Sequence, residues 1–270
     1  MGERTLLENV EGVREKYPIF LGTISLVGAI SLSISSCLAA TCEKTTFPNS
    51  AQIPFTNIKG NSEYAHVWGR ENMKITEQWV VVSFPKGSFS PSNGDIKGGA
   101  WFIYAPQALA QATHTKLSYT LTFADNFNFV KWGKLPGLCG GDCPRGGNAD
   151  EKWFSTRFMW RRNGALEVYG YFQGKAEQSI GRGMFYFVPW KQYEISQELK
   201  MNTPGKRDGV VKVFVDGKCV YEDTSMVFDT HSDISPNKML FSTFFWGSDA
   251  SWATPVDTSI SFWNFTVEWK

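Results

Sequence analysis

The sequence predicts an all-β fold, either a sandwich or a barrel. From about Thr45 to the C-terminus no segment of useful length has a helical period, and short runs of alternating apolar and polar residues follow one another instead. Gly, Pro, Asn and Asp separate these runs, as turn residues do between neighbouring strands. Of the 270 residues, 42% are hydrophobic and 15% are aromatic, so the chain can build a substantial core.

The strands are expected in order along the chain, with turns between them. The expected strands are Gln78–Phe84, Gly99–Tyr104, Lys116–Phe123, Trp153–Trp160, Leu166–Phe172, Val210–Asp216, Lys218–Tyr221, Leu240–Trp246 and Ser259–Trp269. Asp216-Gly217 is a favoured turn for a hairpin. A short helix is expected at Ala105–Gln111.

Two details of this layout carry further expectations. The region Leu135–Glu151 is rich in glycine and is expected to be a long loop, a feature that is more often functional than accidental in a compact domain. The last strand is expected to place four large residues on one face. These are Trp263, Phe265, Val267 and Trp269.

The N-terminal region has a different composition from the rest. Ile19 to Ala40 is an apolar run without a charged residue, and Arg14 and Lys16 precede it. A basic flank and a small-residue exit are typical of a signal peptide. About 20 apolar residues are also enough to span a membrane. We expect a leader over residues 1–41, acting as signal peptide or as membrane anchor through 19–40, and one domain over residues 42–270 that is secreted or held outside the cytosol; a buried core helix is the least expected alternative.

Charge and cysteine content narrow the classes of function. The 27 Lys and Arg nearly balance the 26 Asp and Glu, which does not favour a nucleic-acid partner, and an anionic ligand would need a local basic cluster. Cys139 and Cys143 are spaced to close a small disulfide loop, while Cys42 and Cys219 remain elsewhere in the domain. Zinc is disfavoured because no His and no second cysteine pair lie near them. We therefore expect disulfides or free thiols.

Polar side chains share one face of two strands in the middle of the chain. Because side chains alternate with period two, Ser155 and Arg157 point to one side of the first strand, and Tyr169 and Tyr171 point to one side of the second. Pairing through the turn Arg162–Ala165 would bring a hydroxyl, a guanidinium and two phenols together. The opposite face is apolar and consists of Phe154, Phe158, Trp160, Leu166, Val168 and Phe172. A planar guanidinium among hydroxyls suits an acidic sugar.

The residues also have structural explanations when they are taken singly. A strand tyrosine is commonly half-buried at the surface. Arg157 could pair with Glu167 across the hairpin. Lys134 could be a solvated loop lysine. Their presence together on one face favours a functional site.

Several motifs in their order resemble polysaccharide lyase family 14, which includes alginate lyases of herbivorous molluscs and cell-wall lyases of chlorella viruses. The motifs are Lys134-Leu135-Pro136-Gly137, Phe154-Ser155-Thr156-Arg157 with Met159-Trp160-Arg161, Tyr169-Gly170-Tyr171 and Phe244-Phe245-Trp246-Gly247-Ser248-Asp249. The resemblance extends from about Ala100 to the C-terminus. It implies a β-jelly roll, which is a concanavalin-like sandwich, and cleavage of a β-(1→4)-linked uronan, either a glucuronan-like wall polymer or alginate, by β-elimination.

The resemblance also implies which residues are catalytic: Lys134, Ser155, Arg157, Tyr169 and Tyr171. β-Elimination removes the proton at C5 of a uronate and expels the oxygen at C4. Arg157 and Lys134 are expected to neutralise the carboxylate. A tyrosine with a pKa near 10 is a poor base, but an adjacent cation lowers that pKa, so one of the two tyrosines is expected to act as base and the other, with Ser155, to orient the sugar.

Other residues are expected to contact the substrate. They are Trp153, Arg161, Glu167, Gln173 and His114. Trp153 suits stacking on a sugar ring and equally a place in the core or at an edge, and His114 suits the cleft or the surface.

The partner is expected to be an acidic polysaccharide, the protein a monomer, and no cofactor is required, although a divalent cation could assist. The alternatives are a non-catalytic carbohydrate-binding sandwich and a glycoside hydrolase. A retaining hydrolase needs two close carboxylates, and this strand pair carries Glu167 alone.

Overall fold

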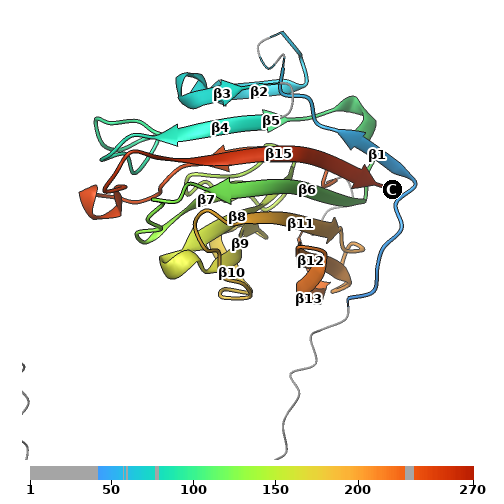
Figure 1. Cartoon of the computed structure of the whole chain (residues 1–270). Helices are drawn as coiled ribbons and strands as arrows, with labels where there is room; N and C mark the ends of the chain where they lie inside the picture. Colours follow the sequence, from blue (N-terminus) through green and yellow to red (C-terminus); the bar gives the residue numbers. More distant parts are fainter. Residues whose placement is uncertain (1–41, 57, 59, 77–78, 229–233) are drawn as a thin grey trace, which may run out of the picture. The chain divides into compact units, whose positions relative to one another are not determined.

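A computed structural model describes residues 42–270 except 57, 59, 77–78 and 229–233. In this part the chain forms two antiparallel β-sheets with short 3-10 turns between strands, so the predicted all-β sandwich is confirmed (Figure 1). The expected leader over residues 1–41 lies outside the described residues and stays a prediction. No helix among the described residues has the length and apolar character needed to cross a membrane.

The first sheet, called here the back sheet, has the order β13-β12-β11-β6-β15-β4-β3, and β1 pairs with β15. Its strands are β1 (Asn49–Gln52), β3 (Met73–Ile75), β4 (Trp79–Phe84), β6 (His114–Phe123), β11 (Gln192–Lys200), β12 (Gly209–Val215), β13 (Lys218–Met226) and β15 (Thr258–Trp269). The Asp216-Gly217 turn joins β12 to β13, as the sequence predicts.

The second sheet, called the front sheet, has the order β10-β9-β8-β7-β14-β5-β2. Its strands are β2 (Tyr64–Trp68), β5 (Ala100–Tyr104), β7 (Trp132–Gly140), β8 (Phe154–Arg161), β9 (Leu166–Phe172), β10 (Lys175–Ile180) and β14 (Lys238–Thr243). At the centre of each sheet, neighbouring strands come from distant parts of the sequence. Long-range contacts therefore hold the domain together.

An aromatic core fills the space between the sheets. Phe102 and Phe241 stack with ring centroids 4.6 Å apart on neighbouring strands of the front sheet, and Tyr119 and Phe265 stack at 4.7 Å on the back sheet. Full burial of one such side chain contributes about 1.5–3 kcal/mol. The inward side chains of each strand therefore form the core, and the outward side chains can bind a ligand or contact solvent.

The first part of the glycine-rich region expected to be a long loop, Leu135–Gly140, belongs to strand β7, and residues 141–151 form a loop as expected. A side chain at Gly133 would lie 1.9 Å from the Trp160 ring, and one at Gly137 would lie 2.0 Å from the carbonyl oxygen of Thr156. The glycines therefore allow close packing against β8, which a reading of glycine as a loop residue does not anticipate. The loop itself is confined to residues 141–153.

Three other expectations need correction. The last strand is interrupted by a bulge at Asn264, whose φ is 54°, so that Phe265 is buried while Trp263 lies on the outer face. The expected helix is only a 3-10 turn at Gln107–Leu109. Strand β14 ends at Thr243 rather than at Trp246.

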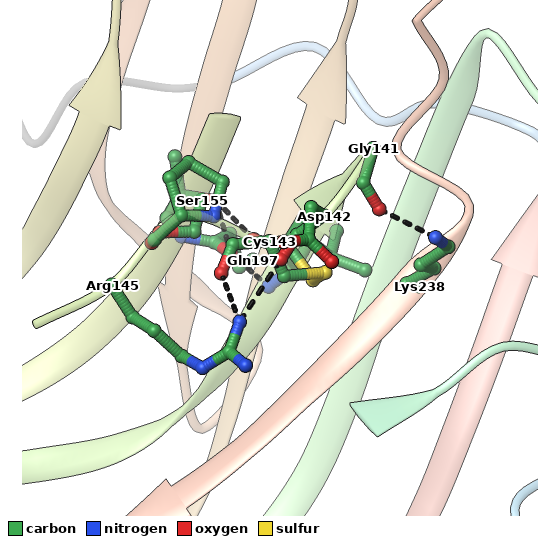
Figure 2. The surroundings of a disulfide bond; sticks show 11 residues. Gly141, Asp142, Cys143, Arg145, Ser155, Gln197 and Lys238 are labelled. Carbon is green, nitrogen blue, oxygen red and sulfur yellow. Dashed lines mark hydrogen bonds between the residues drawn. A yellow bond between two sulfur atoms is a disulfide. The ribbon is translucent and has the colours of Figure 1, made fainter. Parts of the chain in front are cut away.

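The cysteines form two disulfides. Cys139 and Cys143 close the loop that follows β7, with Cα atoms 5.1 Å apart (Figure 2). Cys42 joins Cys219 on β13, with Cα atoms 5.8 Å apart. The predicted small disulfide loop is confirmed, and neither pair is a zinc site.

Candidate active site

The hairpin of β8 and β9 places the four polar side chains on one face, as the alternating pattern predicts. Ser155 lies opposite Tyr171, and Arg157 lies opposite Tyr169. The apolar residues of both strands point into the core, so these four side chains share the outer face of the front sheet. The connecting turn is a 3-10 turn at Arg162–Gly164.

A pocket of about 230 Å³ lies on this outer face and crosses several strands of the front sheet. Lys134 from β7, Arg157 from β8 and Tyr171 from β9 line it, and Trp101 and Trp246 contribute aromatic surface. A larger cavity of about 970 Å³ lies at the back sheet, but none of its described lining residues is charged. Charge complementarity to an anionic ligand therefore favours the smaller pocket.

Lys134 is 2% exposed. Its Nζ lies 3.2 Å from the centroid of the Tyr169 ring and donates to Sδ of Met159 at 3.1 Å. No carboxylate forms an ion pair with it in the described part of the chain. Burial, followed by the repulsion of Arg157 and Arg161, holds the pKa of Lys134 well below its usual value. This lowering favours the neutral amine, and a neutral amine can accept a proton.

Arg157 is a buried cation without an ionic partner among the described residues. Its side chain lines the pocket, its guanidinium carbon lies 5.6 and 5.7 Å from the ring centroids of Tyr169 and Tyr171, and its buried Nε has no hydrogen-bond partner. The alternative pairing with Glu167 is wrong, because that carboxylate binds other arginines. A buried charge is costly unless it is compensated, so this guanidinium is suited to receive an anion from outside.

The two tyrosines touch through their hydroxyls, which are 3.4 Å apart. Tyr171 lines the pocket and accepts a hydrogen bond from the backbone N–H of Gly147 at 3.1 Å. Burial raises the pKa of Tyr169, and its contacts with Tyr171 and Glu177 raise it further. The expected lowering by nearby cations is thus wrong for Tyr169, because desolvation and a neighbouring carboxylate outweigh them.

Ser155 does not reach the pocket. It is fully buried, and its hydroxyl donates to the carbonyl oxygen of Pro144 at 2.6 Å. Its role in the structure is to hold the loop of residues 141–153 against β8, rather than to contact a sugar. Trp153 lies at the end of that loop, is 38% exposed and lines a second small pocket, so it stays a candidate for stacking.

Arg161 and Glu167 form a buried ionic network beside the pocket. The Glu167 carboxylate accepts from Nη2 of Arg161, from Nε of Arg182 at 2.6 Å and from Oγ of Ser179 at 2.7 Å. The Arg161 guanidinium carbon lies 4.1 Å from the centroid of the Trp132 ring. Neither Arg161 nor Glu167 lines the pocket, so the expectation that they contact substrate stays a prediction.

The last two expected substrate contacts also lie elsewhere. Gln173 is in the turn between β9 and β10, and its Nε2 donates to the carbonyl of Val227 at 2.8 Å. His114 is on the outward face of β6 in the back sheet and is 2.8 Å from Glu198. Strand spacing alone does not reveal which of two sheets a residue joins, and this is why His114 was misplaced.

Replacing Glu167 by Gln is expected to lower the free energy of unfolding by about 3–5 kcal/mol, because Arg161 would remain buried without its counter-charge. The side chain of Arg182 is 55% exposed, so Arg182→Gln is expected to cost at most about 1 kcal/mol. Denaturant unfolding of both variants measures the difference. Equal stabilities would contradict the network described here.

Some residues at the site were not singled out from the sequence. Arg145 lines the pocket from the disulfide loop, Met159 contacts Lys134, and Glu177 contacts Tyr169 from β10. The position of Met159 could have been predicted from the sequence, because it follows from the same alternation that places Arg157. The positions of Glu177 and Arg145 could not have been predicted in this way, because a bulge places Glu177 and a loop places Arg145.

No group of three or more His, Cys, Asp and Glu side chains within the described residues is arranged to hold a metal ion. Assistance by a divalent cation stays a prediction.

Comparison with known proteins agrees with the fold. The sequence model of the family Polysaccharide lyase 14 matches residues 72–265. The solved structure of the marine PL-14 alginate lyase from Aplysia kurodai is 30% identical, with a TM-score of 0.72, and the match covers 84% of this chain and 100% of that one. A search of curated proteins gives no match.

More distant structures share the fold. The alginate lyase vAL-1 from Chlorella virus is 20% identical with a TM-score of 0.70, and the match covers 83% of this chain and 100% of that one. The endo-beta-1,4-glucuronan lyase from the fungus Trichoderma reesei is 10% identical with a TM-score of 0.54, covering 83% and 96%. The family match over residues 72–265 and the Aplysia likeness place the chain: it belongs to the polysaccharide lyase 14 family and is a polysaccharide lyase.

Proposed function

We propose that the protein cleaves a β-(1→4)-linked uronan by β-elimination and leaves a C4=C5 double bond on one product. The observation that carries this proposal is Arg157, a buried guanidinium that faces a pocket and has no carboxylate partner in the described part of the chain. Alginate is the first candidate substrate, because the 30% identical Aplysia enzyme is an alginate lyase. Glucuronan is the second candidate. It is proposed only because it is also a β-(1→4)-linked uronan.

In this proposal Arg157 binds the substrate carboxylate, whose charge must be neutralised before the proton at C5 can leave. The planar guanidinium can donate two parallel hydrogen bonds to it. As the C5–H bond breaks, negative charge moves into the carboxylate, where a preorganised cation stabilises it. Arg157 is suited to this role because it stays charged even when buried.

Lys134 is the proposed base, in place of a tyrosine. Its neutral Nζ takes the C5 proton, the C–H electron pair forms the C4=C5 bond, and the C4–O bond breaks. Tyr171 gives its phenolic proton to the departing O4, and Lys134 then returns a proton to Tyr171 through solvent. Tyr169 keeps its own proton, since its pKa is raised, and it packs beneath Nζ of Lys134.

The product identifies the reaction class. Incubation with alginate, glucuronan and pectate is expected to give ultraviolet absorbance from the C4=C5 bond, strongest with alginate. New reducing ends without this absorbance would indicate a hydrolase. Binding of the polymer without cleavage would indicate a non-catalytic binding domain. Either of these results would overturn the proposal.

The two tyrosines are expected to differ in importance. Tyr171→Phe should lower kcat by about 10²-fold, because the leaving oxygen loses its proton donor. Tyr169→Phe should lower kcat by less than about tenfold, since Tyr169 does not line the pocket. Steady-state kinetics on alginate compares the two variants directly. The assignment fails if Tyr169→Phe is the more damaging change.

A further inference from the structure

The disulfide loop carries a second guanidinium to the pocket. Nη1 of Arg145 donates to the backbone carbonyls of Asp142 and Cys143, both at 3.0 Å (Figure 2). Its guanidinium carbon lies 4.7 Å from the centroid of the Trp101 ring. Two hydrogen bonds and an aromatic face fix the orientation of this cation, which a lysine in the same place could not reproduce.

Some hydrogen-bond donors of Arg145 are not used within the described part of the chain. Its Nε and Nη2 form no hydrogen bond, and no carboxylate pairs with it, within the described residues. Arg145 is only partly buried. It also lies close enough to Arg157 for its charge to contribute to lowering the pKa of that residue. Two guanidiniums so placed favour a ligand with more than one negative charge.

Arg145 is shared by two pockets. It lines the catalytic pocket together with Arg157, and it also lines the second pocket, of about 230 Å³, together with Trp153. A chain that enters the first pocket and continues into the second must pass this guanidinium. Trp153 would then offer a flat apolar surface to a further sugar ring.

We propose that Arg145 binds the carboxylate of a second uronate, adjacent to the one held by Arg157, and that the Cys139–Cys143 disulfide fixes Arg145 for this purpose. The proposal rests on the proposed function and specifies its substrate as a run of consecutive uronates. A polyuronate carries one carboxylate per sugar, so a cation at each of two neighbouring positions selects it over a polymer of isolated acidic residues.

The loop is anchored at several positions just before Arg145. The disulfide ties Cys143 to Cys139 on β7, the hydroxyl of Ser155 holds the carbonyl of Pro144, and Nζ of Lys238 donates to the carbonyl of Gly141. Cys143 has a φ of 51°, a backbone conformation that a non-glycine residue adopts at a cost. Its carbonyl is one of the two acceptors for Arg145, so the cross-link holds an acceptor in place.

The first test is Arg145→Gln, measured on alginate. We expect KM to rise about tenfold or more, since a hydrogen-bonded charge pair with the substrate is lost, while kcat stays within about twofold. Arg207→Gln is the matched control, because Arg207 is exposed on the turn before β12 in the back sheet and its loss removes the same charge. An unchanged KM, or a fall in kcat alone, would overturn the proposal.

The substrate offers a complementary test. Partial esterification of alginate carboxylates should raise KM for the wild type by a larger factor than for Arg145→Gln. The variant lacks the guanidinium that binds the second carboxylate, so the loss of that charge does not affect it. Equal factors would show that Arg145 does not contact a carboxylate. If the wild type forms no unsaturated product at all, the proposed function itself fails, and this result is distinct from either outcome.

A cycle of variants tests the disulfide. Cys139→Ser with Cys143→Ser should raise KM about as much as Arg145→Gln, and adding Arg145→Gln to it should have little further effect. Cys42→Ser with Cys219→Ser removes the other cross-link and should leave KM unchanged. Additive effects in the cycle would show that the disulfide does not act through Arg145. Should the loop variant fail to fold, reduction of the Cys42→Ser with Cys219→Ser protein, with and without Arg145→Gln, gives the same comparison, because the loop disulfide is the one that remains of the two.

Discussion

Replacing Lys134 by Met is expected to lower kcat by about 10⁴-fold while making the fold more stable by about 0.5–2 kcal/mol. The loss of activity follows from removal of the proposed base, and general base catalysis contributes up to about this factor. The gain in stability follows from burial, because Nζ of Lys134 lies against the Tyr169 ring and Met159 without a carboxylate partner in the described residues. Kinetics and denaturant unfolding measure the two effects on the same protein.

The pH dependence of Lys134→Met has a definite sign. The pKa of Lys134 is lower in the folded than in the unfolded state, so the unfolded state binds more protons between the two values. The wild type therefore loses stability as the pH falls through this window, and Lys134→Met does not. The stability difference between them should grow toward low pH. In the wild type, kcat/KM should rise with pH through the folded pKa of Lys134, as the amine loses its proton.

Lys134→Arg separates the role of a base from that of a charge. It keeps a cation at the position but has no accessible neutral form, so it should be nearly as inactive as Lys134→Met. Retained activity in Lys134→Arg would show that Lys134 supplies charge only. In that event the base is another group and the mechanism proposed here is wrong.

Arg157→Gln is expected to lower kcat by about 10²–10³-fold and to raise KM. Loss of one preorganised donor to a developing oxyanion has about this effect on kcat. Arg157→Lys should recover only part of the activity, since an ammonium is a point charge and cannot bind a carboxylate in bidentate fashion. Steady-state kinetics on alginate, with esterified alginate for comparison, gives both parameters.

The control for Arg157→Gln is Arg162→Gln. Arg162 lies in the turn between β8 and β9, is exposed, and carries the same charge on the same hairpin. It should retain wild-type kinetics. Similar losses in both variants would mean that overall charge matters rather than the guanidinium in the pocket.

Local alternation in the sequence was enough to predict part of the site. That Ser155, Arg157, Tyr169 and Tyr171 share one face follows from period two and a short connection, both of which depend on neighbouring residues only. Alternation was not enough to place His114, because it assigns a residue to a face of a strand and not to a sheet. It also missed β7, where Gly133 and Gly137 fit against β8 residues more than 15 positions away.

The sequence by itself determined the all-β architecture, the composition of the polar face and, through its motifs, the likeness to polysaccharide lyases. Only the tertiary structure decided how those groups behave. Desolvation and the arginines of β8 lower the pKa of Lys134, and desolvation with Tyr171 and Glu177 raises the pKa of Tyr169. Arg145 lines the pocket from the loop that the Cys139–Cys143 disulfide closes. The pKa of a buried side chain, and the pocket that a loop residue lines, depend on which distant segments pack together and exclude water at that point. The spacing of residues along the chain does not directly show how distant segments pack.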